Sequence, residues 1–379
     1  MSDRVHSLLV LGGGVSGWTL ACFTKVFHPE IRVTVVERER KAIGRILVSG
    51  NGRCNIYNRN IYENTLPEDR AFDGLRRILT PGLGKKALDT FMEVFRVPVY
   101  WQGDLCYPFS NRSDTVWQAM LDKASKLGVI LESGTAIKID RDKGGALIDA
   151  GGKKKFIQAD RTAVCLGGSS LNYPAFDWNI LDGLKADITP FTPALGPIPV
   201  KENLKGLEGV RIKGTLSLLD RGNRVYSEPG EILFRKKEIS GICAFDCSIR
   251  IDSKRIQDFQ LSLDCTAHDG EKVDLERYPL THIFPSAFAQ YLHYRSADSD
   301  LRSVASDLRF QVAGLPDFKN SQVSKGGVSL DSIDLPSFTF KSDPRFLCLG
   351  ETLDASMPCG GYNIGSCIVE ALSAASALK

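Results

Sequence analysis

The N-terminal block of this chain constrains its fold more than any other part of the sequence. An uninterrupted apolar run over residues 7–11 is followed at once by a glycine cluster, a helical stretch over 18–27, and a second apolar run over 32–36 that ends at Glu37. Apolar runs of this kind are typical of strands that are buried on both faces of a parallel sheet. The order strand, glycine turn, helix, strand predicts a βαβ unit.

Three glycines in this block, Gly12, Gly14 and Gly17, match the pattern GxGxxG. The first allows a tight turn, the second lets a pyrophosphate approach the backbone, and the third lets helix and strand pack closely. The helix N-terminus adds free N–H groups and positive partial charge for the phosphates, and Glu37 can accept hydrogen bonds from a ribose diol. A glycine-rich turn without a ligand is the alternative, but the surrounding βαβ unit favours a dinucleotide site.

The composition excludes some classes of protein but does not indicate a function. The chain has 379 residues, of which 43% are hydrophobic and 25% charged. That is enough for two or three globular domains of about 100–200 residues each. The formal net charge of +3 is too small to indicate a nucleic-acid or membrane partner. We find no secretory signal and no apolar run of roughly 18–20 residues, the length of a membrane span, so we expect neither partner.

The cysteines and histidines argue against a disulfide framework and against a metal site. Ten cysteines occur without regular spacing and without a CxxC pair. This is typical of free thiols in a reducing cytoplasm, which is the location that we expect. The five histidines show no metal-ligand spacing, so the sequence predicts no metal.

Two further segments suit a backbone that passes close to a bound cofactor. Residues 44–55 combine small residues with two asparagines and two arginines, and Gly167 and Gly168 directly follow a buried strand over 162–166. Glycine permits the backbone conformations and the close approach that such a loop needs. For residues 44–55, spacing alone leaves an ordinary surface turn equally open.

The C-terminal part of the chain has its own chemistry. A buried strand over 345–349 ends at Gly350 and Glu351, and residues 357–363 open a terminal helix rich in alanine and serine. A carboxylate at a strand end can bind ribityl hydroxyls. A helix N-terminus aimed at the pyrimidine edge of a flavin stabilises negative charge on the reduced ring. The alternative is a plain turn before a helix.

The middle of the chain predicts an insertion. Strand-like runs over 135–139, 146–150 and 154–158 indicate a β-meander within the first domain. A proline-rich connection then begins near Pro190, and the cofactor-type segments resume only near the C-terminus. We therefore predict a discontinuous cofactor-binding domain with an inserted substrate domain, over residues 1–190 and 326–379 and residues 191–325, respectively.

The predicted insertion is mainly β-structure. Runs with strand-like alternation lie around residues 209–219, 224–226 and 244–249, and a helical stretch follows over about 285–311.

The sequence resembles the bacterial flavoproteins known as NAD(P)/FAD-dependent oxidoreductases. This family includes proteins described as aminoacetone oxidases and as reductases of bile-acid intermediates. The resemblance spans nearly the whole chain, and its second and fourth blocks are specific. The four blocks are residues 12–17, residues 49–55 (SGNGRCN), residues 325–330 (KGGVSL), and Gly350-Glu351 with residues 360–363 (GGYN).

The resemblance implies an α/β fold: a glutathione-reductase-type FAD-binding Rossmann domain with an inserted β-rich, partly helical substrate domain. It implies pyrophosphate binding at the glycine turn and adenosine-ribose binding by Glu37. It also implies adenine contact near Ala136, ribityl binding by Glu351, and contact of residues 361–364 with the pyrimidine edge. The residues expected to bind FAD are Gly12, Gly14, Val15, Ser16, Gly17, Glu37, Arg38, Arg45, Ser49, Gly50, Asn51, Gly52, Arg53, Cys54, Asn55, Ala136, Gly167, Gly168, Gly326, Gly327, Gly350, Glu351, Gly361, Tyr362, Asn363 and Ile364.

Two departures from the family pattern fall on the expected substrate side. Where the family has Phe-Thr-His followed by Gly-Ile-Ser-Gly-Pro, residues 234–242 read FRKKEISGI, with Lys236 at the histidine position and Glu238 before Ile-Ser-Gly. After Gly168 the family has a turn rich in Gly, Ser and Thr, whereas residues 171–178 read LNYPAFDW. The expectation of FAD therefore carries over, and the identity of the substrate does not.

The leading interpretation is an FAD-dependent oxidoreductase acting on a small or mid-sized organic substrate. Because only one GxGxxG is present, NADH or NADPH would visit the flavin transiently, and an oxidase that passes electrons to oxygen is the other option. Two further interpretations are an FAD-dependent RNA-modifying enzyme and a non-catalytic flavin carrier or sensor.

The sequence assigns no catalytic residue. Cys54 lacks a partner cysteine and is more typical of a packed thiol than of a redox group. Lys236 and Glu238 are candidates for the substrate side, but a surface salt bridge explains them equally well.

Overall fold

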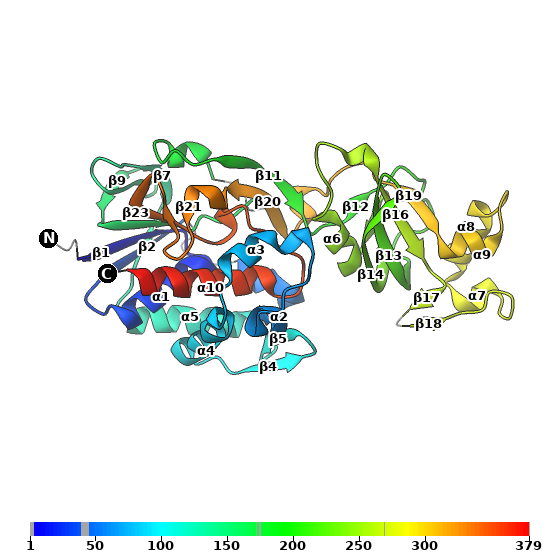
Figure 1. The fold of residues 1–379 in the computed structure, drawn as a ribbon, viewed down its shortest axis with the longest axis horizontal. Coiled ribbons are helices and arrows are strands. Elements are labelled where there is room, and N and C mark those ends of the chain that lie inside the picture. Colours follow the sequence, from blue (N-terminus) through cyan, green and yellow to red (C-terminus); the bar gives the residue numbers. More distant parts are fainter. Residues whose placement is uncertain (1–3, 39–44, 172, 174–175, 269, 379) are drawn as a thin grey trace. The chain divides into compact units, whose positions relative to one another are not determined.

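The computed structural model describes residues 4–38, 45–171, 173, 176–268 and 270–378. The chain divides into two compact units. Unit 1 comprises Met1–Ser169, Tyr173–Phe191 and Lys325–Lys379, and unit 2 comprises Ser170–Asn172 and Thr192–Ser324. Figure 1 labels most of the helices and strands of both units, which are described separately below.

Unit 1 is built on a seven-stranded sheet in the order β21-β22-β23-β10-β1-β2-β6, counted over the described residues. Neighbouring strands from β23 to β6 pair in parallel. At the other edge of the sheet, β22 pairs with β23 and β21 pairs with β22, both antiparallel. The central parallel strands β1, β10 and β23 are mostly apolar and buried because helices and loops cover the sheet, whereas the edge strand β6 is largely exposed. The strands are β1 (Ser7–Leu11), β2 (Arg32–Glu37), β6 (Ile130–Ser133), β10 (Arg161–Val164), β21 (Ile333–Asp334), β22 (Thr339–Phe340) and β23 (Asp343–Cys348).

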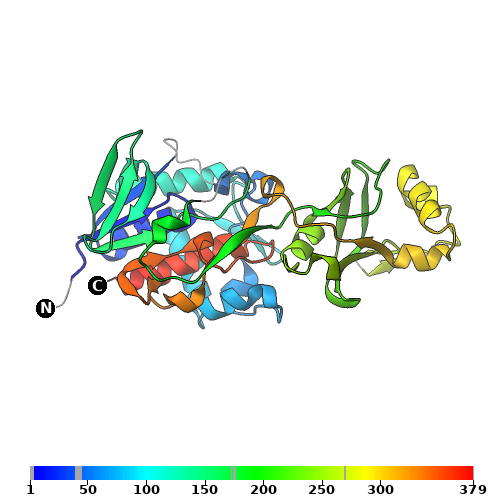
Figure 2. The same ribbon diagram turned by 90° about the horizontal axis from the view of Figure 1, so that it is seen from above.

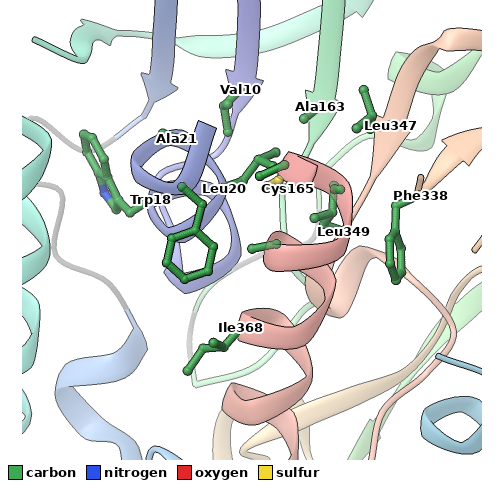
Figure 3. Close-up of a cluster of buried hydrophobic side chains, with 14 of the residues drawn as sticks. Val10, Trp18, Leu20, Ala21, Ala163, Cys165, Phe338, Leu347, Leu349 and Ile368 are labelled. Carbon is green, nitrogen blue, oxygen red and sulfur yellow. The ribbon is translucent and has the colours of Figure 1, made fainter. Parts of the chain in front are cut away.

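Two helices, α1 (Val15–Phe27) and α10 (Tyr362–Ala377), pack against each other beside this sheet. Figure 3 shows Val10, Ala163 and Leu347, from three neighbouring strands, in one apolar cluster with side chains of both helices. The other helices of unit 1 are α2 (Arg59–Glu63), α3 (Asp73–Ile78), α4 (Leu83–Phe95) and α5 (Ser113–Lys126).

Unit 1 also carries two small antiparallel sheets. The predicted β-meander is confirmed as β7 (Thr135–Ile139), β8 (Gly145–Asp149) and β9 (Lys154–Gln158), whose green strands are seen from a second side in Figure 2. The other sheet has the order β3-β5-β4 and consists of β3 (Tyr57–Asn58), β5 (Leu105–Pro108) and β4 (Val99–Gln102).

Unit 2 is an antiparallel sheet of six strands in the described residues, with its own buried apolar cluster. Its order is β12-β15-β14-β13-β16-β19. The strands are β12 (Ile198–Pro199), β13 (Arg211–Asp220), β14 (Asn223–Phe234), β15 (Glu238–Ser240), β16 (Phe259–Asp264) and β19 (Leu308–Gln311), and the helices are α6 (Ile242–Ser248), α7 (Leu280–Ile283), α8 (Ser286–Arg295) and α9 (Leu301–Ser306).

Two sequence-based predictions for unit 2 are wrong. Residues 244–249 lie mostly in helix α6 instead of a strand, because Gly241 at φ 119° ends β15 and the following buried residues recur at helical spacing. Residues 308–311 form strand β19 instead of continuing a helix, because Leu308 and Phe310 alternate inward and pair with β16.

The remaining elements are short. Two small sheets pair β11 (Ile188–Ala194) with β20 (Val323–Val328), and β17 (Ala267–His268) with β18 (Glu271–Lys272). Among the described residues, no helix combines the length and the apolar character that crossing a membrane requires. The 3-10 turns are η1 (Arg45–Gly52), η2 (Arg70–Phe72), η3 (Trp178–Leu181), η4 (Ile256–Asp258), η5 (Phe318–Asn320), η6 (Leu330–Ser332) and η7 (Gly350–Thr352).

Candidate functional site

The three glycines of the GxGxxG pattern, two in the turn between β1 and α1 and one inside α1, have different surroundings. A Cβ atom on Gly12, which has φ 105°, would lie 2.2 Å from the carbonyl oxygen of Cys165, and one on Gly17 would lie 2.0 Å from the carbonyl oxygen of Gly12. A Cβ on Gly14 would meet no described atom within 4 Å. Packing therefore explains Gly12 and Gly17, whereas Gly14 borders open space.

This open space lies at the N-terminus of α1. Gly14 is the N-cap and offers no side chain to the first N–H groups, which belong to Val15, Ser16 and the residues after them. Uncapped N–H groups at a helix start attract an anion. Ser16 also lies against the start of η7, since a Cβ on Gly350 would lie 2.6 Å from the Oγ of Ser16.

Glu37 bends back over the glycine turn. Its carboxylate accepts a hydrogen bond of 2.7 Å from the backbone N–H of Gly13. Arg38 follows as an exposed residue, and Gly44, the first residue of the next motif, lies outside the described residues. Ala136 is buried in β7, three residues after Ser133, which is the register partner of Glu37 in the sheet. The first part of the predicted site is thus brought together at one sheet edge.

Arg45 joins three segments that are far apart in the sequence. Its Nη1 lies 2.7 Å from Oε2 of Glu351, and both side chains are largely buried. A Cβ on Gly167 would lie 1.9 Å from Nη2 of Arg45, so this glycine makes room for the guanidinium. Gly168 follows as a buried residue. Sequence reasoning placed Arg45 and Glu351 near the flavin separately and did not predict their ion pair.

The loop over residues 49–55 is tightly folded on itself. The N–H of Cys54 donates to the carbonyl of Ser49 at 3.1 Å, and that of Arg53 donates to Gly50 at 3.1 Å. Gly50, Asn51, Gly52 and Cys54 all have positive φ angles. Glycine or asparagine adopts this conformation most readily, which explains the composition of the loop.

Cys54 is a packed thiol. Its side chain is fully buried, and this burial raises the pKa of the thiol to about 12. A neutral thiol is a poor nucleophile and a poor redox group, so the geometry agrees with the structural interpretation of this cysteine.

The start of α10 is held by the segment that follows this loop. A Cβ on Gly361 would lie 2.4 Å from the carbonyl oxygen of Tyr57 and 2.7 Å from Oδ1 of Asn55. Asn58 donates to the carbonyl of Gly360 at 2.8 Å. The Gly361 N-cap makes no side-chain cap hydrogen bond, so α10 begins beside Asn55 without a capping side chain.

The residues after Gly361 mainly shape this helix start. Asn363 accepts from the N–H of Met357 at 3.0 Å and donates to its carbonyl at 2.7 Å, which closes the preceding loop. Tyr362 is buried against Phe72, and its hydroxyl accepts from Asn60 at 2.7 Å. Ile364 is half-buried against the apolar cluster.

Gly326 and Gly327 are needed for close backbone approach within unit 1. A Cβ on Gly326 would lie 2.5 Å from the carbonyl oxygen of Pro190, and one on Gly327 would lie 2.6 Å from that of Thr352. Both have positive φ angles of 98° and 132°. Gly327 therefore packs on the turn that carries Glu351.

Sequence reasoning missed Glu370, a buried carboxylate on α10. Its Oε2 accepts from the N–H of Gly350 at 2.6 Å, and its Oε1 accepts from the hydroxyl of Ser366. Burial raises the pKa of Glu370 to about 7. A single acid in an otherwise apolar, small-residue helix is the signal that could have identified it. Glu370 supports the backbone that presents Glu351.

The predicted substrate-side segment forms a hairpin turn in unit 2. Glu238 pairs with Arg235, at 3.7 Å, while Lys236 and Lys237 are exposed. The remaining segment, residues 171–178, is described only in part, since residues 172, 174 and 175 lie outside the described residues. The described residues contain no group of three or more His, Cys, Asp or Glu side chains that could hold a metal ion.

Two characterised proteins are similar to this chain over almost its full length. The 3-dehydro-bile acid delta(4,6)-reductase of Clostridium scindens is 24% identical over 395 residues, covering 94% of each chain. The ribosomal RNA dihydrouridine synthase of Escherichia coli is 21% identical over 392 residues, covering 94% of this chain and 93% of that one.

Among solved structures, the open conformation of a flavocytochrome c3 fumarate reductase matches with a TM-score of 0.50 and 13% identity, covering 98% of this chain and 78% of that chain. This likeness concerns the fold alone. It agrees with the predicted fold class, an FAD-binding Rossmann domain with an inserted β-rich, partly helical domain. That fold class is confirmed, and the inserted sheet is antiparallel. The model of the HI0933-like protein Rossmann domain matches residues 6–377, and the chain therefore belongs to this family.

Proposed function

We propose that the chain is an FAD-dependent oxidoreductase and that unit 1 binds the FAD. The observation that carries this proposal is the open space at Gly14, at the uncapped N-terminus of α1. A Cβ on Gly12 or Gly17 would collide with a backbone carbonyl oxygen. A Cβ on Gly14 would enter open space, where a ligand can bind. The helix N-terminus suits the negative charge of a pyrophosphate, and the absence of a side chain at Gly14 lets such a group approach the backbone.

The remaining residues fit the other parts of FAD. Glu37 would bind the adenosine ribose, and Glu351, oriented by Arg45, would bind the ribityl hydroxyls. The N-terminus of α10 would face the pyrimidine edge, where its partial positive charge stabilises a reduced, anionic flavin. When bound, FAD supplies hydride exchange, while the protein supplies position and electrostatics.

For the substrate, we infer a carbon–carbon double bond conjugated to a carbonyl group. The names of both relatives describe this chemistry, since a delta(4,6)-reductase of a 3-dehydro compound and a dihydrouridine synthase each saturate such a bond. A small or mid-sized enone is the first candidate. Uridine in RNA is the second, and the similarity to the ribosomal RNA enzyme favours it.

We further propose that NADH or NADPH reduces the flavin during a transient visit, because the chain has one glycine turn of the dinucleotide type. An oxidase would instead pass electrons from its substrate to oxygen. A carrier or sensor would turn over with neither a nicotinamide nor oxygen.

Anaerobic reduction of the FAD-loaded protein separates these possibilities. We expect purified protein to take up FAD with the absorbance of a bound flavin, to be bleached by NADH or NADPH, and to be reoxidised faster by cyclohexenone than by oxygen. Faster reoxidation by unmodified ribosomal RNA would select the second candidate. Protein that fails to take up added FAD would overturn the proposal.

A further inference from the structure

Arg53 is a positively charged side chain whose partners are all neutral. Its Nε donates to Oδ1 of Asn111 at 2.9 Å, and its Nη2 donates to Oε1 of Gln102 at 3.0 Å and to the hydroxyl of Tyr100 at 3.4 Å. The guanidinium lies 4.2 Å from the ring centroid of Tyr107. Within the described part of the chain, no carboxylate lies within ion-pair distance, and Nη1 donates no hydrogen bond.

A second arginine, Arg59 at the start of α2, also packs on an aromatic side chain of the small sheet β3-β5-β4 and shows the usual arrangement. Arg59 lies 4.6 Å from the ring centroid of Trp101, much as Arg53 lies on its tyrosine. However, Arg59 is also paired with Asp104 at 3.6 Å and with Glu63 at 3.4 Å. The two arginines therefore share the aromatic contact and differ in whether their charge is compensated.

This difference points to a ligand. A half-buried cation has lost part of its hydration, and a bound anion that compensates its charge would stabilise it. The three neutral acceptors and the tyrosine ring fix the guanidinium plane of Arg53 and leave the Nη1 edge available. A fixed guanidinium edge binds the oxygens of a carboxylate or a phosphate.

The position of Arg53 indicates which molecule carries that anion. Arg53 lies two residues before Asn55, whose Oδ1 is 2.7 Å from the Cβ position of Gly361 at the start of α10. Under the proposed function, on which this inference depends, this is the pyrimidine end of the flavin. The FAD phosphates belong at the other helix start, at Gly14.

We propose that Arg53, with Tyr100, Gln102 and Asn111, forms an oxyanion site for the molecule that exchanges electrons with the flavin. The site takes a carboxylate or phosphate group and holds it on the Nη1 edge of Arg53.

Calorimetric titration of the FAD-saturated protein with inorganic phosphate tests the site itself. We expect Arg53→Gln to weaken phosphate binding at least about tenfold and Arg59→Gln, the matched control, to change it less than about twofold. Equal binding in wild type and Arg53→Gln, equal losses in both variants, or no binding to the wild type would overturn the proposal. If Arg53→Gln does not fold, Arg53→Lys should bind phosphate with intermediate affinity. FAD uptake is read from absorbance, so failure of the proposed function is seen separately.

Steady-state kinetics then identify the source of the anion. NADPH differs from NADH by one phosphate, and an unsaturated oxo acid differs from its methyl ester by one carboxylate. An Arg53→Gln variant whose KM rises for NADPH alone assigns the site to the electron donor, and one whose KM rises for the acid alone assigns it to the substrate. Unchanged KM values in all four cases would contradict the proposal.

Discussion

Glu370 lies in the apolar packing between α10 and the end of β23, where it is 2% exposed. Three cysteine thiols interact electrostatically with it, those of Cys165, Cys348 and Cys367. Burial raises the pKa of each thiol above its ordinary value, so all three stay neutral near pH 7. Among the described residues, no lysine or arginine forms an ion pair with the Glu370 carboxylate. Its hydrogen bonds to Gly350 and Ser366 orient the backbone next to Glu351.

The pKa of Glu370, raised by burial from 4.5 to about 7, makes stability depend on pH. The unfolded chain loses this proton near pH 4.5 and the folded chain near 7, so folding stability falls as pH rises through this interval. Glu370→Gln keeps an acceptor for the N–H of Gly350 and cannot ionise. We expect it to match wild type near pH 5 and to be more stable above pH 8, by roughly 3 kcal/mol at most. Urea unfolding at both pH values measures this, with exposed Glu208→Gln as the control. A difference that does not vary with pH would contradict the assignment.

Cys54 provides a second prediction at the scale of one residue. Because its thiol is buried and its pKa is raised to about 12, we expect it to resist iodoacetamide at pH 8 until the chain unfolds. The half-buried Cys359 serves as the internal reference and should be alkylated first. Mass spectrometry of the labelled peptides measures both. Rapid labelling of Cys54 in folded protein would reopen a redox role for it.

At the scale of elements, the turn between β1 and α1 separates binding from folding. Gly14 has φ −79°, which alanine adopts readily, and its Cβ position is open. We therefore expect Gly14→Ala to fold like wild type and to lose FAD affinity by at least about tenfold. Gly17→Ala places a methyl group 2.0 Å from a carbonyl oxygen, and we expect it to lose stability by about 1–3 kcal/mol. Thermal unfolding by circular dichroism and FAD titration by fluorescence separate the two effects. Wild-type FAD affinity in Gly14→Ala would count against the phosphate site.

Also at the scale of elements, one short segment shows how a local sequence pattern can predict the wrong secondary structure. The N-terminal βαβ unit was predictable because each of its residues obeys one rule for strand, turn or helix. Residues 244–249 were misread as a strand because five or six residues cannot separate period 2 from period 3.6. What decided the outcome was the left-handed Gly241, which ends β15 and starts α6.

At the scale of the whole molecule, the chain has two separate apolar clusters. One is built from residues 5–184 and 328–378, and the other from residues 198–312. Two clusters of this kind can unfold independently. We expect calorimetry to resolve two transitions and FAD at a hundredfold excess over its Kd to stabilise one of them, by about 3 kcal/mol. A single transition, or an equal shift of both, would contradict this expectation.

By itself, the sequence determined the fold class and most of the segments that make up the candidate site. The segments Gly12–Gly17, residues 49–55 and residues 360–363 can be recognised locally, from turn residues and strand ends, and their roles in FAD binding stay a prediction. Only the tertiary structure decided which of them meet. The Arg45–Glu351 pair joins residues 306 positions apart. The neutral surroundings of Arg53, within the described part of the chain, come from residues 100, 102, 107 and 111. Electrostatic partners are set by packing across the chain, and the sequence pattern around a single residue carries no record of them.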